Sequence, residues 1–347
     1  MSDAVRAALA TVIDGGTLDR DVAYRAMGAV MDGESTPAQL AALLVALRMR
    51  GQTVDELAGF ATVMRERVLR VEAPAGSMDI VGTGGDGSGT FNISTTSAFI
   101  VAAAGVPVAK HGNRAITSKA GAADVLDALG VRIDHDAASA GASLRTLGFA
   151  FLFALNFHPA MRHAGPTRRE IGVRTAFNLL GPLTNPAGTS RGVIGVGVPE
   201  VAGKVAEVAR RLGTERTFVI HGAGLDELPL DGTGVIHDVT QAGIETRTVI
   251  PERLGLRSAP TARLAGADPA ANAKMVEAVL RGEPGVRRDV TVLNAAAAFL
   301  VAGRVGSLEE GVDRAALTID AGLAMELLGA LRAERREAEA AAAAATS

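Results

Sequence analysis

The sequence predicts an α/β protein, with a helical N-terminal domain and a larger α/β domain built on a mostly parallel central sheet. Residues 3–70 repeat apolar side chains at helical spacing. From Ser77 onward, short apolar strands alternate with helices, which is typical of a parallel sheet. A glycine-rich turn separates the first of these strands from the first helix. Because ligands of parallel sheets bind at the carboxyl ends of strands, this turn is the first candidate for a ligand site.

Two capping boxes mark helix starts in the N-terminal part. Residues 36–39 read Thr-Pro-Ala-Gln and residues 53–56 read Thr-Val-Asp-Glu, so each hydroxyl precedes a Gln or Glu by three positions. They predict helices over 38–49 and from 53 to about 69. Tyr24, Met27 and Met31 form a stripe on an earlier helix, which we interpret as core or subunit interface.

The remaining elements follow from the alternation of apolar runs and turn residues. Strands are expected at 78–81, 106–109, 131–133, 149–155, 191–198, 217–220, 234–238, 245–249 and 290–292. Helices are expected at 97–104, 121–129, 137–147, 201–212, 269–280, 295–302 and 308–331. Residues 159–182 interrupt this pattern, with a basic helical stretch at 162–174 and a loop at 179–186.

These elements predict two domains and a tail. The helical domain comprises residues 1–72, and we expect 159–187 to return to it. The α/β domain comprises 77–158 and 190–331. Residues 332–347 are a low-complexity Glu/Ala tail, helical or frayed, to which we assign no function.

The glycine-rich turn has the features of a phosphate site. Residues 80–95 read Ile-Val-Gly-Thr-Gly-Gly-Asp-Gly-Ser-Gly-Thr-Phe-Asn-Ile-Ser-Thr. Glycines allow the backbone to approach an anion, and the free N–H groups and dipole of the following helix favour negative charge. The spacing also matches the dinucleotide fingerprint, but the next strand ends on Lys-His-Gly-Asn-Arg at 110–114 instead of an acidic residue. A cation there suits further phosphate.

Composition excludes several classes of protein. The net charge is −3 and the pI about 6.1, so no basic field is present to hold nucleic acid or an anionic membrane. Aromatic residues make up only 3%, and cysteine is absent, which rules out disulfides and thiolate metal sites. No apolar run reaches the roughly 20 residues of a membrane span, and no signal-peptide core is seen. We expect a cytoplasmic protein.

Three further features have both a functional and a structural interpretation. Asp226 and Glu227 follow an apolar strand, where adjacent carboxylates suit Mg²⁺ but are also common in solvated turns. Arg168 suits a carboxylate ligand, although the residues alone favour a solvated helix face with Glu170. His111 is either a ligand contact or a packed histidine; the six histidines show no zinc pattern.

The stretch at 82–95, followed by Lys-His-Gly-Asn-Arg at 110–114, closely resembles the anthranilate phosphoribosyltransferase family of tryptophan biosynthesis. The resemblance covers almost the whole chain up to about Leu331. It implies the nucleoside phosphorylase/phosphoribosyltransferase type of fold, usually as a homodimer through the helical domain. The implied reaction transfers the phosphoribosyl group of 5-phosphoribosyl 1-diphosphate to the amine of anthranilate, giving N-(5-phosphoribosyl)anthranilate and diphosphate, with Mg²⁺ required.

The resemblance also implies which positions bind each ligand. The diphosphate sugar would meet Gly82, Gly85, Asp86, Thr90, Asn92, Ile93, Ser94, Thr95, Lys110, His111, Gly112, Asn113, Arg114, Ala115, Ile116, Thr117, Ser118 and Ala122. Anthranilate would meet Gly82, Asn113 and Arg168, and Mg²⁺ would meet Ser94, Asp226 and Glu227. The family commonly has serine where this chain has Ala122, and one lost neutral hydrogen bond is worth on the order of 1 kcal/mol.

The implied mechanism is a dissociative displacement at the ribose C1, in which diphosphate leaves and the aryl amine then attacks. An aryl amine is unprotonated at neutral pH, so we assign no general base. Two alternatives are a pyrimidine nucleoside phosphorylase of similar architecture and a non-catalytic, nucleic-acid-binding relative of the fold. The acidic pI and the retained Asp226 and Glu227 argue against the second alternative.

Overall fold

The computed structural model describes residues 2–115 and 119–345. Four helices come first and a seven-stranded sheet covered by helices follows, which confirms the predicted fold class. Ile116, Thr117 and Ser118, which the resemblance assigns to the diphosphate-sugar site, lie outside the described residues. Among the described residues, no helix combines the length and apolar character that crossing a membrane requires.

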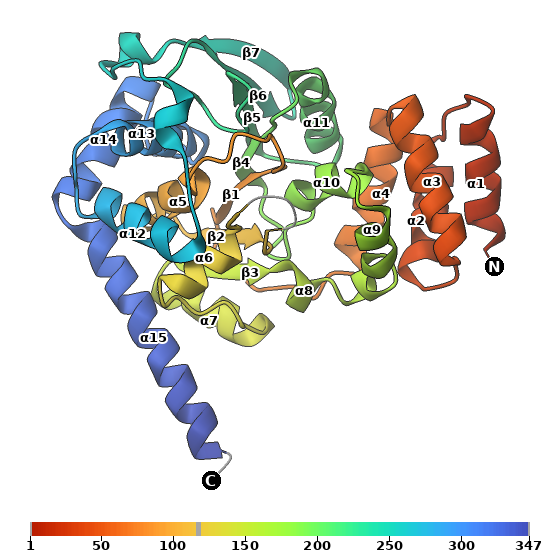
Figure 1. Ribbon diagram of the computed structural model, residues 1–347, viewed down its shortest axis with the longest axis horizontal. Helices are drawn as coiled ribbons and strands as arrows, with labels where there is room; N and C mark the ends of the chain where they lie inside the picture. Colours follow the sequence, from red (N-terminus) through yellow and green to blue (C-terminus); the bar gives the residue numbers. More distant parts are fainter. Residues whose placement is uncertain (1, 116–118, 346–347) are drawn as a thin grey trace.

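The N-terminal part consists of α1 (Asp3–Ile13), α2 (Arg20–Met31), α3 (Pro37–Arg50) and α4 (Val54–Glu66), shown in red and orange in Figure 1. Both predicted capping boxes are present, at the starts of α3 and α4. Met27 and Met31 are buried in the core of these helices, as the stripe predicts. Tyr24 packs at the edge of that core, and its hydroxyl donates to Glu66.

The sheet contains β1 (Met78–Gly82), β2 (Val108–Gly112), β3 (Phe149–Phe153), β4 (Arg191–Gly195), β5 (Arg216–Gly222), β6 (Gly234–Thr240) and β7 (Gly243–Val249). Their order is β3-β2-β1-β4-β5-β6-β7; β1 to β5 pair in parallel, and β6 is antiparallel to both neighbours. The glycine-rich turn therefore leaves the same sheet edge as the segments that follow β2, β4 and β5.

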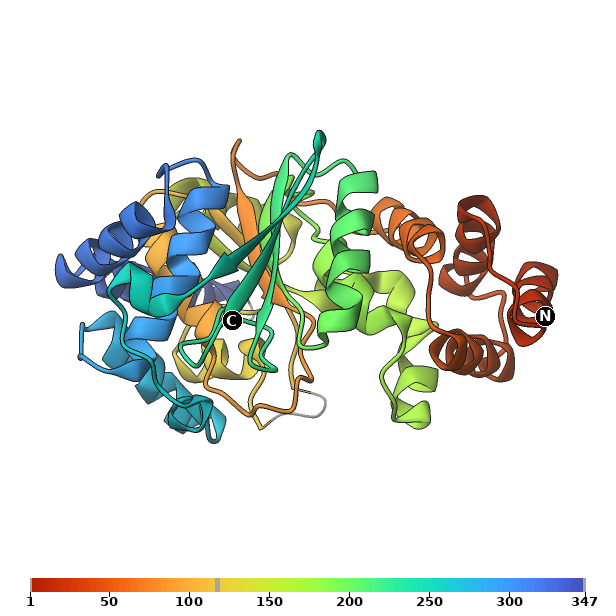
Figure 2. The same cartoon turned by 90° about the horizontal axis from the view of Figure 1, so that it is seen from above.

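Helices cover both faces of the sheet, as Figure 2 shows. The helices that follow β1 in the chain are α5 (Ile93–Ala103), α6 (Ala122–Ala128), α7 (Ala137–Thr146), α8 (Ala154–Phe157), α9 (Gly165–Ile171), α10 (Ala176–Leu180), α11 (Pro199–Arg211), α12 (Pro269–Leu280), α13 (Val286–Val301), α14 (Leu308–Asp320) and α15 (Leu323–Ala345). Short 3₁₀ turns lie at Pro159–Arg162, Gly181–Leu183, Pro251–Leu254 and Thr261–Leu264. Because successive strand residues face opposite sides, Val193 packs in the core with α5 and α13, and Ile194 packs with α4 and α11.

The segment that interrupts the alternation lies against the N-terminal helices. α9 contacts α3, and α10 contacts both α3 and α4. Ala164, Phe177 and Leu180 share one apolar core with the N-terminal helices. This packing is what a discontinuous helical domain would require, and the division into domains stays a prediction.

The predicted strand at 131–133 is wrong. The backbone N–H of Val131 donates to Leu126 O at 2.9 Å, and that of Gly130 donates to Asp127 O at 3.0 Å. Gly130 has φ of 77°. These bonds close the end of α6, so the segment is used as a helix terminus and does not reach the sheet.

The predicted strand at 290–292 is also wrong, because these residues lie inside α13. Val290, Thr291 and Val292 are all buried. The β-branched run favours a strand locally, but helical packing on the sheet overrides that preference. The Thr291 hydroxyl donates to Arg287 O at 2.7 Å, which satisfies it within the helix.

Further boundaries differ from the prediction, and the helix expected at 308–331 is divided at Ala321 and Gly322 into α14 and α15. The stretch at 162–174 is not one helix, since α9 ends at Ile171 and is capped by Gly172, whose φ is 67°. The expected loop at 179–186 begins inside α10, which ends at Leu180, and continues as a 3₁₀ turn. The tail is helical as far as Ala345, because α15 continues through it, away from the sheet in Figure 1.

Glu56 ties three segments of the N-terminal helices together. Its carboxylate is fully buried, accepts from the backbone N–H of Leu18 at 2.9 Å and of Thr53 at 2.8 Å, and pairs with Arg50. Removing one partner of a buried pair leaves the other charge and its donors unsatisfied.

We predict that Glu56→Ala lowers the free energy of unfolding by about 3–5 kcal/mol. Its neighbour Asp55 is half-exposed and, among the described residues, pairs only with Arg211 at the surface, so Asp55→Ala should cost less than about 1 kcal/mol. Urea unfolding of both variants tests this. Equal losses would show that the buried network does not stabilise the helices.

Candidate active site

The glycine-rich turn after β1 is shaped by the close approach of Asp226. A Cβ on Gly82 would lie 2.2 Å from Asp226 Oδ2, and one on Gly195 would lie 1.6 Å from the Asp226 backbone oxygen. Gly82 and Gly195 are register partners on β1 and β4. The Asp226 carboxylate accepts from the Gly84 N–H at 2.9 Å. Glycine, which has no Cβ, is therefore required at positions 82 and 195 for the segment after β5 to reach the turn.

Three carboxylates converge at this turn. Asp86, Asp226 and Glu227 each offer an oxygen within 4.8 Å of the others. Asp86 comes from the turn itself, and Asp226 and Glu227 come from the segment after β5. The backbone N–H of Asp226 also donates to Asp86 Oδ2 at 3.4 Å. The sequence identifies Asp226 and Glu227 as candidate metal ligands; the structure adds Asp86, which the resemblance assigns to the diphosphate sugar.

The electrostatics of this acidic cluster favour a cation. Burial raises the pKa of Glu227 well above its usual range, and Asp226 adds to that shift. Burial, and then Asp86, also raises the pKa of Asp226. Glu227 Oε2 is buried and has no hydrogen-bond partner among the described residues. Because Mg²⁺ takes one or two carboxylates plus substrate phosphates, this donor set fits it.

Lys110 lies beneath the acidic cluster. Its side chain is buried in β2, and Nζ donates to Ile80 O at 2.6 Å. Burial lowers its pKa, while Asp79, Glu227 and Asp226 oppose that shift. The structure thus places this cation as a counter-charge inside the protein.

Asp79, His111 and His158 are further buried polar residues near Lys110. Asp79 accepts from the His111 N–H at 3.1 Å and from Asn185 Nδ2 at 2.7 Å, and burial raises its pKa to about 6. The His111 ring donates from Nδ1 to Gly181 O at 3.2 Å and lies 5.1 Å from the His158 ring. Burial and His158 lower the pKa of His111 to about 3, and burial lowers that of His158 to about 4. Of the two interpretations of His111, the geometry fits the packed, neutral histidine.

The loop after β2 is held by two acidic residues of α6. Asp124 Oδ2 accepts from the backbone N–H groups of Ala115 at 2.9 Å and Gly121 at 3.0 Å, and Asp124 pairs with Arg114 at 2.8 Å. Asn113 Oδ1 accepts from the Arg114 N–H. Ala122 begins α6. A Cβ on Gly112 would be 3.4 Å from the Ala122 methyl group, so the two residues lie side by side.

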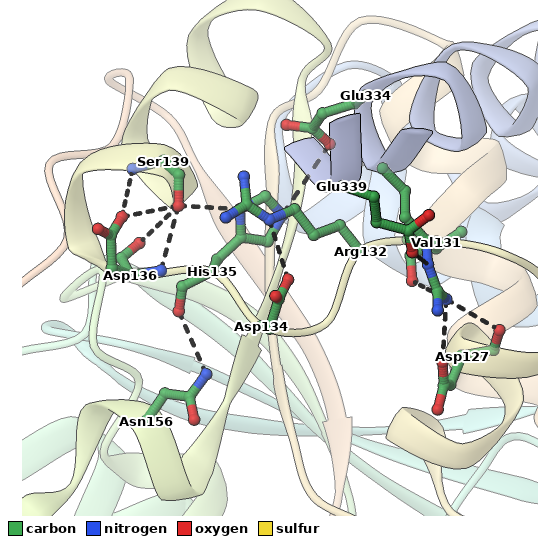
Figure 3. Close-up of polar contacts among 11 residues, drawn as sticks. Asp127, Val131, Arg132, Asp134, His135, Asp136, Ser139, Asn156, Glu334 and Glu339 are labelled. Carbon is green, nitrogen blue, oxygen red and sulfur yellow. Dashed lines mark hydrogen bonds and ion pairs between the residues drawn. The ribbon is translucent and has the colours of Figure 1, made fainter. Parts of the chain in front are cut away.

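Asp127 links this loop to the C-terminal helix. It lies 3.5 Å from the Arg114 guanidinium and 2.9 Å from that of Arg335 on α15. Figure 3 shows Asp127 and Val131 beside that helix, and His135 facing Glu334 farther along. Such partly exposed pairs contribute about 0.2–1 kcal/mol each, so they orient Arg114 more than they stabilise the fold.

The N-terminus of α5 presents the other predicted phosphate residues. Asn92 makes no side-chain cap; its Oδ1 accepts from Asn272 Nδ2 at 2.9 Å, and its Nδ2 donates to Ala120 O at 3.4 Å. The first-turn N–H groups of α5 therefore receive no side-chain oxygen from it, which suits an anion. Ile93 and Thr95 are buried, Ser94 is half-buried, and Thr90 forms a bridge with Ala265.

Arg168 and Arg174 lie in different surroundings. The Arg168 guanidinium lies 4.6 Å from the Phe177 ring centroid, and burial lowers its pKa to about 10. No hydrogen bond or ion pair to it is found in the described part of the chain. Arg174 Nη1 donates to Gly84 O in the turn. The local sequence does not identify Arg174 as a site residue, because its partner Gly84 lies 90 residues earlier in the chain.

Comparison with known proteins gives consistent matches over nearly the whole chain. The helical-bundle domain of the glycosyl transferase family matches residues 6–68, and the α/β domain of that family matches residues 75–325. The anthranilate phosphoribosyltransferase of Xanthobacter autotrophicus is 52% identical, over 91% of this chain and 92% of its own. That of Azorhizobium caulinodans is 51% identical, over 94% and 95%.

Solved structures agree with these matches. The anthranilate phosphoribosyltransferase of Thermus thermophilus superimposes with a TM-score of 0.89 at 46% identity, covering 95% of this chain and 99% of its own. The enzyme from Saccharomyces cerevisiae, in complex with PRPP and Mg, gives a TM-score of 0.89 at 25% identity, covering 97% and 99%. By its sequence and its fold, the chain belongs to the anthranilate phosphoribosyltransferases of the glycosyl transferase family.

Proposed function

We propose that this protein transfers the phosphoribosyl group of 5-phosphoribosyl 1-diphosphate to the amine of anthranilate, giving N-(5-phosphoribosyl)anthranilate and diphosphate. The observation that carries the proposal is the convergence of Asp86, Asp226 and Glu227 on a glycine-rich turn at a helix N-terminus. Such a site can accept a cation and a phosphate together. Relatives about 50% identical bear the name of this activity.

Asp86, Asp226, Glu227 and Ser94 would hold Mg²⁺. When bound, Mg²⁺ neutralises charge on the diphosphate and so favours its departure. The backbone N–H groups of the turn and of the first turn of α5 bind the phosphate oxygens. Arg114, oriented by Asp124 and Asp127, adds a positive charge beside them.

The chain's own residues position the reactants more than they transfer protons. As diphosphate leaves, positive charge develops on the ribose ring, and the carboxylates of the turn stabilise it electrostatically. His111 and His158 remain neutral and packed, since burial holds the pKa of each well below 6.5. The unprotonated aryl amine attacks C1 as the bond to diphosphate breaks, and the resulting acidic ammonium then loses its extra proton to water or to the diphosphate. No general base is needed before attack, so orientation supplies much of the rate enhancement.

Arg168 is the proposed partner of the anthranilate carboxylate, with Gly82 and Asn113 beside it. A half-buried guanidinium without a carboxylate partner in the described chain gains most from binding one. Stacking on Phe177 fixes the plane of the guanidinium and so orients it for a bidentate contact.

Apolar side chains on the outer face of the helical part support a homodimer. Ile13 on α1 is 66% exposed, and Val45 and Met49 on α3 are 37% and 84% exposed. α1 and α3 are packed side by side. A second copy would cover this apolar face. In analytical ultracentrifugation we expect a dimer, and Met49→Asp should shift it toward monomer; a monomeric parent protein would contradict the proposal.

The activity is tested by mixing the protein with anthranilate, 5-phosphoribosyl 1-diphosphate and Mg²⁺ and following the loss of anthranilate fluorescence. A loss of anthranilate fluorescence that requires the protein, the diphosphate sugar and Mg²⁺ supports the proposal. Phosphorolysis of thymidine or uridine without Mg²⁺, and no loss of anthranilate, would identify a nucleoside phosphorylase instead. Salt-dependent DNA binding without either activity would identify the nucleic-acid-binding alternative.

We predict that Asp226→Asn with Glu227→Gln lowers activity severely and alters its Mg²⁺ dependence, while the protein stays folded. The folded-state pKa of each carboxyl is raised, so ionisation in the folded protein costs stability as pH rises above 3.8 and 4.5. Without metal at pH 7, the variant should therefore be as stable as the parent or more stable. Rate against Mg²⁺ concentration, with thermal melts from pH 4 to pH 7, tests both statements.

The exposed Asp231→Asn serves as the control for that variant, because it removes a carboxylate from the same segment outside the acidic cluster. Mg²⁺ curves that superimpose for the parent and the double variant would rule out the metal site.

Arg168→Ala is predicted to raise KM for anthranilate by roughly 30-fold, since a hydrogen bond to a charged group is worth about 2 kcal/mol. KM for the diphosphate sugar should change little. The neighbouring Arg169 is exposed, so Arg169→Ala controls for loss of charge. Steady-state kinetics with each substrate varied in turn measures both KM values. An equal rise in the two values would show that Arg168 does not bind anthranilate.

Gly85→Val should abolish binding of the diphosphate sugar while leaving helical content intact. Gly85 has φ of 64°, and its Cβ would lie 2.3 Å from Arg174 Nη1. A β-branched residue resists this backbone conformation and blocks approach of phosphate. Gly76→Val has similar backbone strain, with φ of 78°, outside the site. Calorimetric titration with the sugar should separate the two, and equal affinity would mean that the turn does not bind phosphate.

A further inference from the structure

A cavity of about 110 Å³ lies between the N-terminal helices and the far side of the glycine-rich turn. Its lining includes the end of α3, the start of α10 and the ends of β1 and β4, with Arg48, Gln52, Thr83, Arg174, Thr175 and Asn178 as its polar residues. Among the described residues, none of the side chains proposed above to bind sugar, anthranilate or metal lines it, although Thr83 belongs to the glycine-rich turn. We infer that this cavity is a second anion site, which binds a small monocarboxylate.

The charges around the cavity favour an anion. Arg48 and Arg174 both line it, and none of the lining residues in the described part of the chain is acidic. Within the described residues, Arg48 has no ion pair, and Arg174 donates only to Gly84 O. Burial lowers the pKa of Arg174, Arg48 lowers it further, and Asp226 and Asp86 act in the opposite direction from the turn. A carboxylate between the two guanidinium groups would relieve their repulsion.

Two buried hydroxyls in the same lining lack partners. Thr83 is 9% exposed and Thr175 is 5% exposed, and neither Oγ1 has a hydrogen-bond partner in the described chain. An unsatisfied buried hydroxyl costs about 1–3 kcal/mol. Asn178 accepts from the Thr175 N–H through Oδ1, which leaves its Nδ2 as a further donor. The lining is therefore rich in donors and poor in acceptors, as an oxyanion requires.

The rest of the lining selects among oxyanions. The apolar wall of the cavity consists of Leu179, Val196, Val198 and Val201. Inorganic phosphate would leave this wall without a partner, whereas a carboxylate with a short apolar body would contact it. A cavity of about 150 Å³ accommodates the six carbons of benzene, so this cavity of about 110 Å³ takes a ligand of no more than about six heavy atoms. Isobutyrate has this size and shape.

Titration calorimetry without substrates or Mg²⁺ tests the site independently of the transferase reaction. We expect one isobutyrate per chain, with at least tenfold weaker binding of the neutral isostere isobutyramide and weaker binding of inorganic phosphate. Arg48→Gln should weaken the binding of isobutyrate at least tenfold, and Thr175→Val should weaken it at least threefold. Arg169→Gln, an exposed arginine of the same segment as Arg174, should leave it unchanged.

Arg168→Gln distinguishes this cavity from the proposed anthranilate site, and isobutyrate affinity should be the same in that variant as in the parent. Absence of binding, equal binding of isobutyramide, or full affinity in Arg48→Gln would overturn the inference. Loss of binding in Arg168→Gln would place the ligand elsewhere and overturn it as well. Tighter binding of phosphate than of isobutyrate would overturn the assignment to a monocarboxylate.

Discussion

The contact between Asp226 and the glycines of β1 and β4 is the constraint on which the active site depends. Gly82 and Gly195 are paired in register, and the chain after β5 crosses both of them at a distance that excludes a Cβ. This approach brings Asp226 and Glu227 against Asp86, and it places the Asp226 carboxylate within hydrogen-bond distance of the Gly84 N–H. The parallel sheet is therefore more than a scaffold, because its glycines determine where the negative charge of the site can lie.

That concentration of carboxylates requires compensation from below and from the side. Lys110 lies beneath the cluster in β2, with Asp79 beside it, and Arg174 reaches the turn from the segment between α9 and α10. These cations reduce the repulsion without removing it, since the pKa values of Asp226 and Glu227 remain raised. Mg²⁺ that binds together with a diphosphate would neutralise the remaining negative charge of the carboxylates. The site therefore suits a diphosphate substrate that binds with a metal ion.

Much of this arrangement was predictable from the sequence, and the exceptions have physical reasons. The capping boxes at Thr36 and Thr53 and the glycine turn are local signals, and the structure contains each of them. Two expected strands do not form. Residues 131–133 do not pair with the sheet because backbone N–H groups there close the end of α6, and residues 290–292 are helical because packing in α13 overrides their β-branched preference. Asp86 as a third carboxylate and Arg174 at the turn depend on contacts across 140 and 90 residues, which no local pattern reveals. The roles of the individual binding residues stay predictions.

We infer that the acidic cluster needs a cation before the turn can accept diphosphate. Calorimetric titration of the protein with 5-phosphoribosyl 1-diphosphate, with and without Mg²⁺ and in the absence of anthranilate, tests it most directly. The account predicts at least tenfold tighter binding with Mg²⁺, because the carboxylates otherwise repel the diphosphate. Equal affinity under the two conditions would contradict the account and would mean that the turn and its helix bind phosphate without help from the three carboxylates.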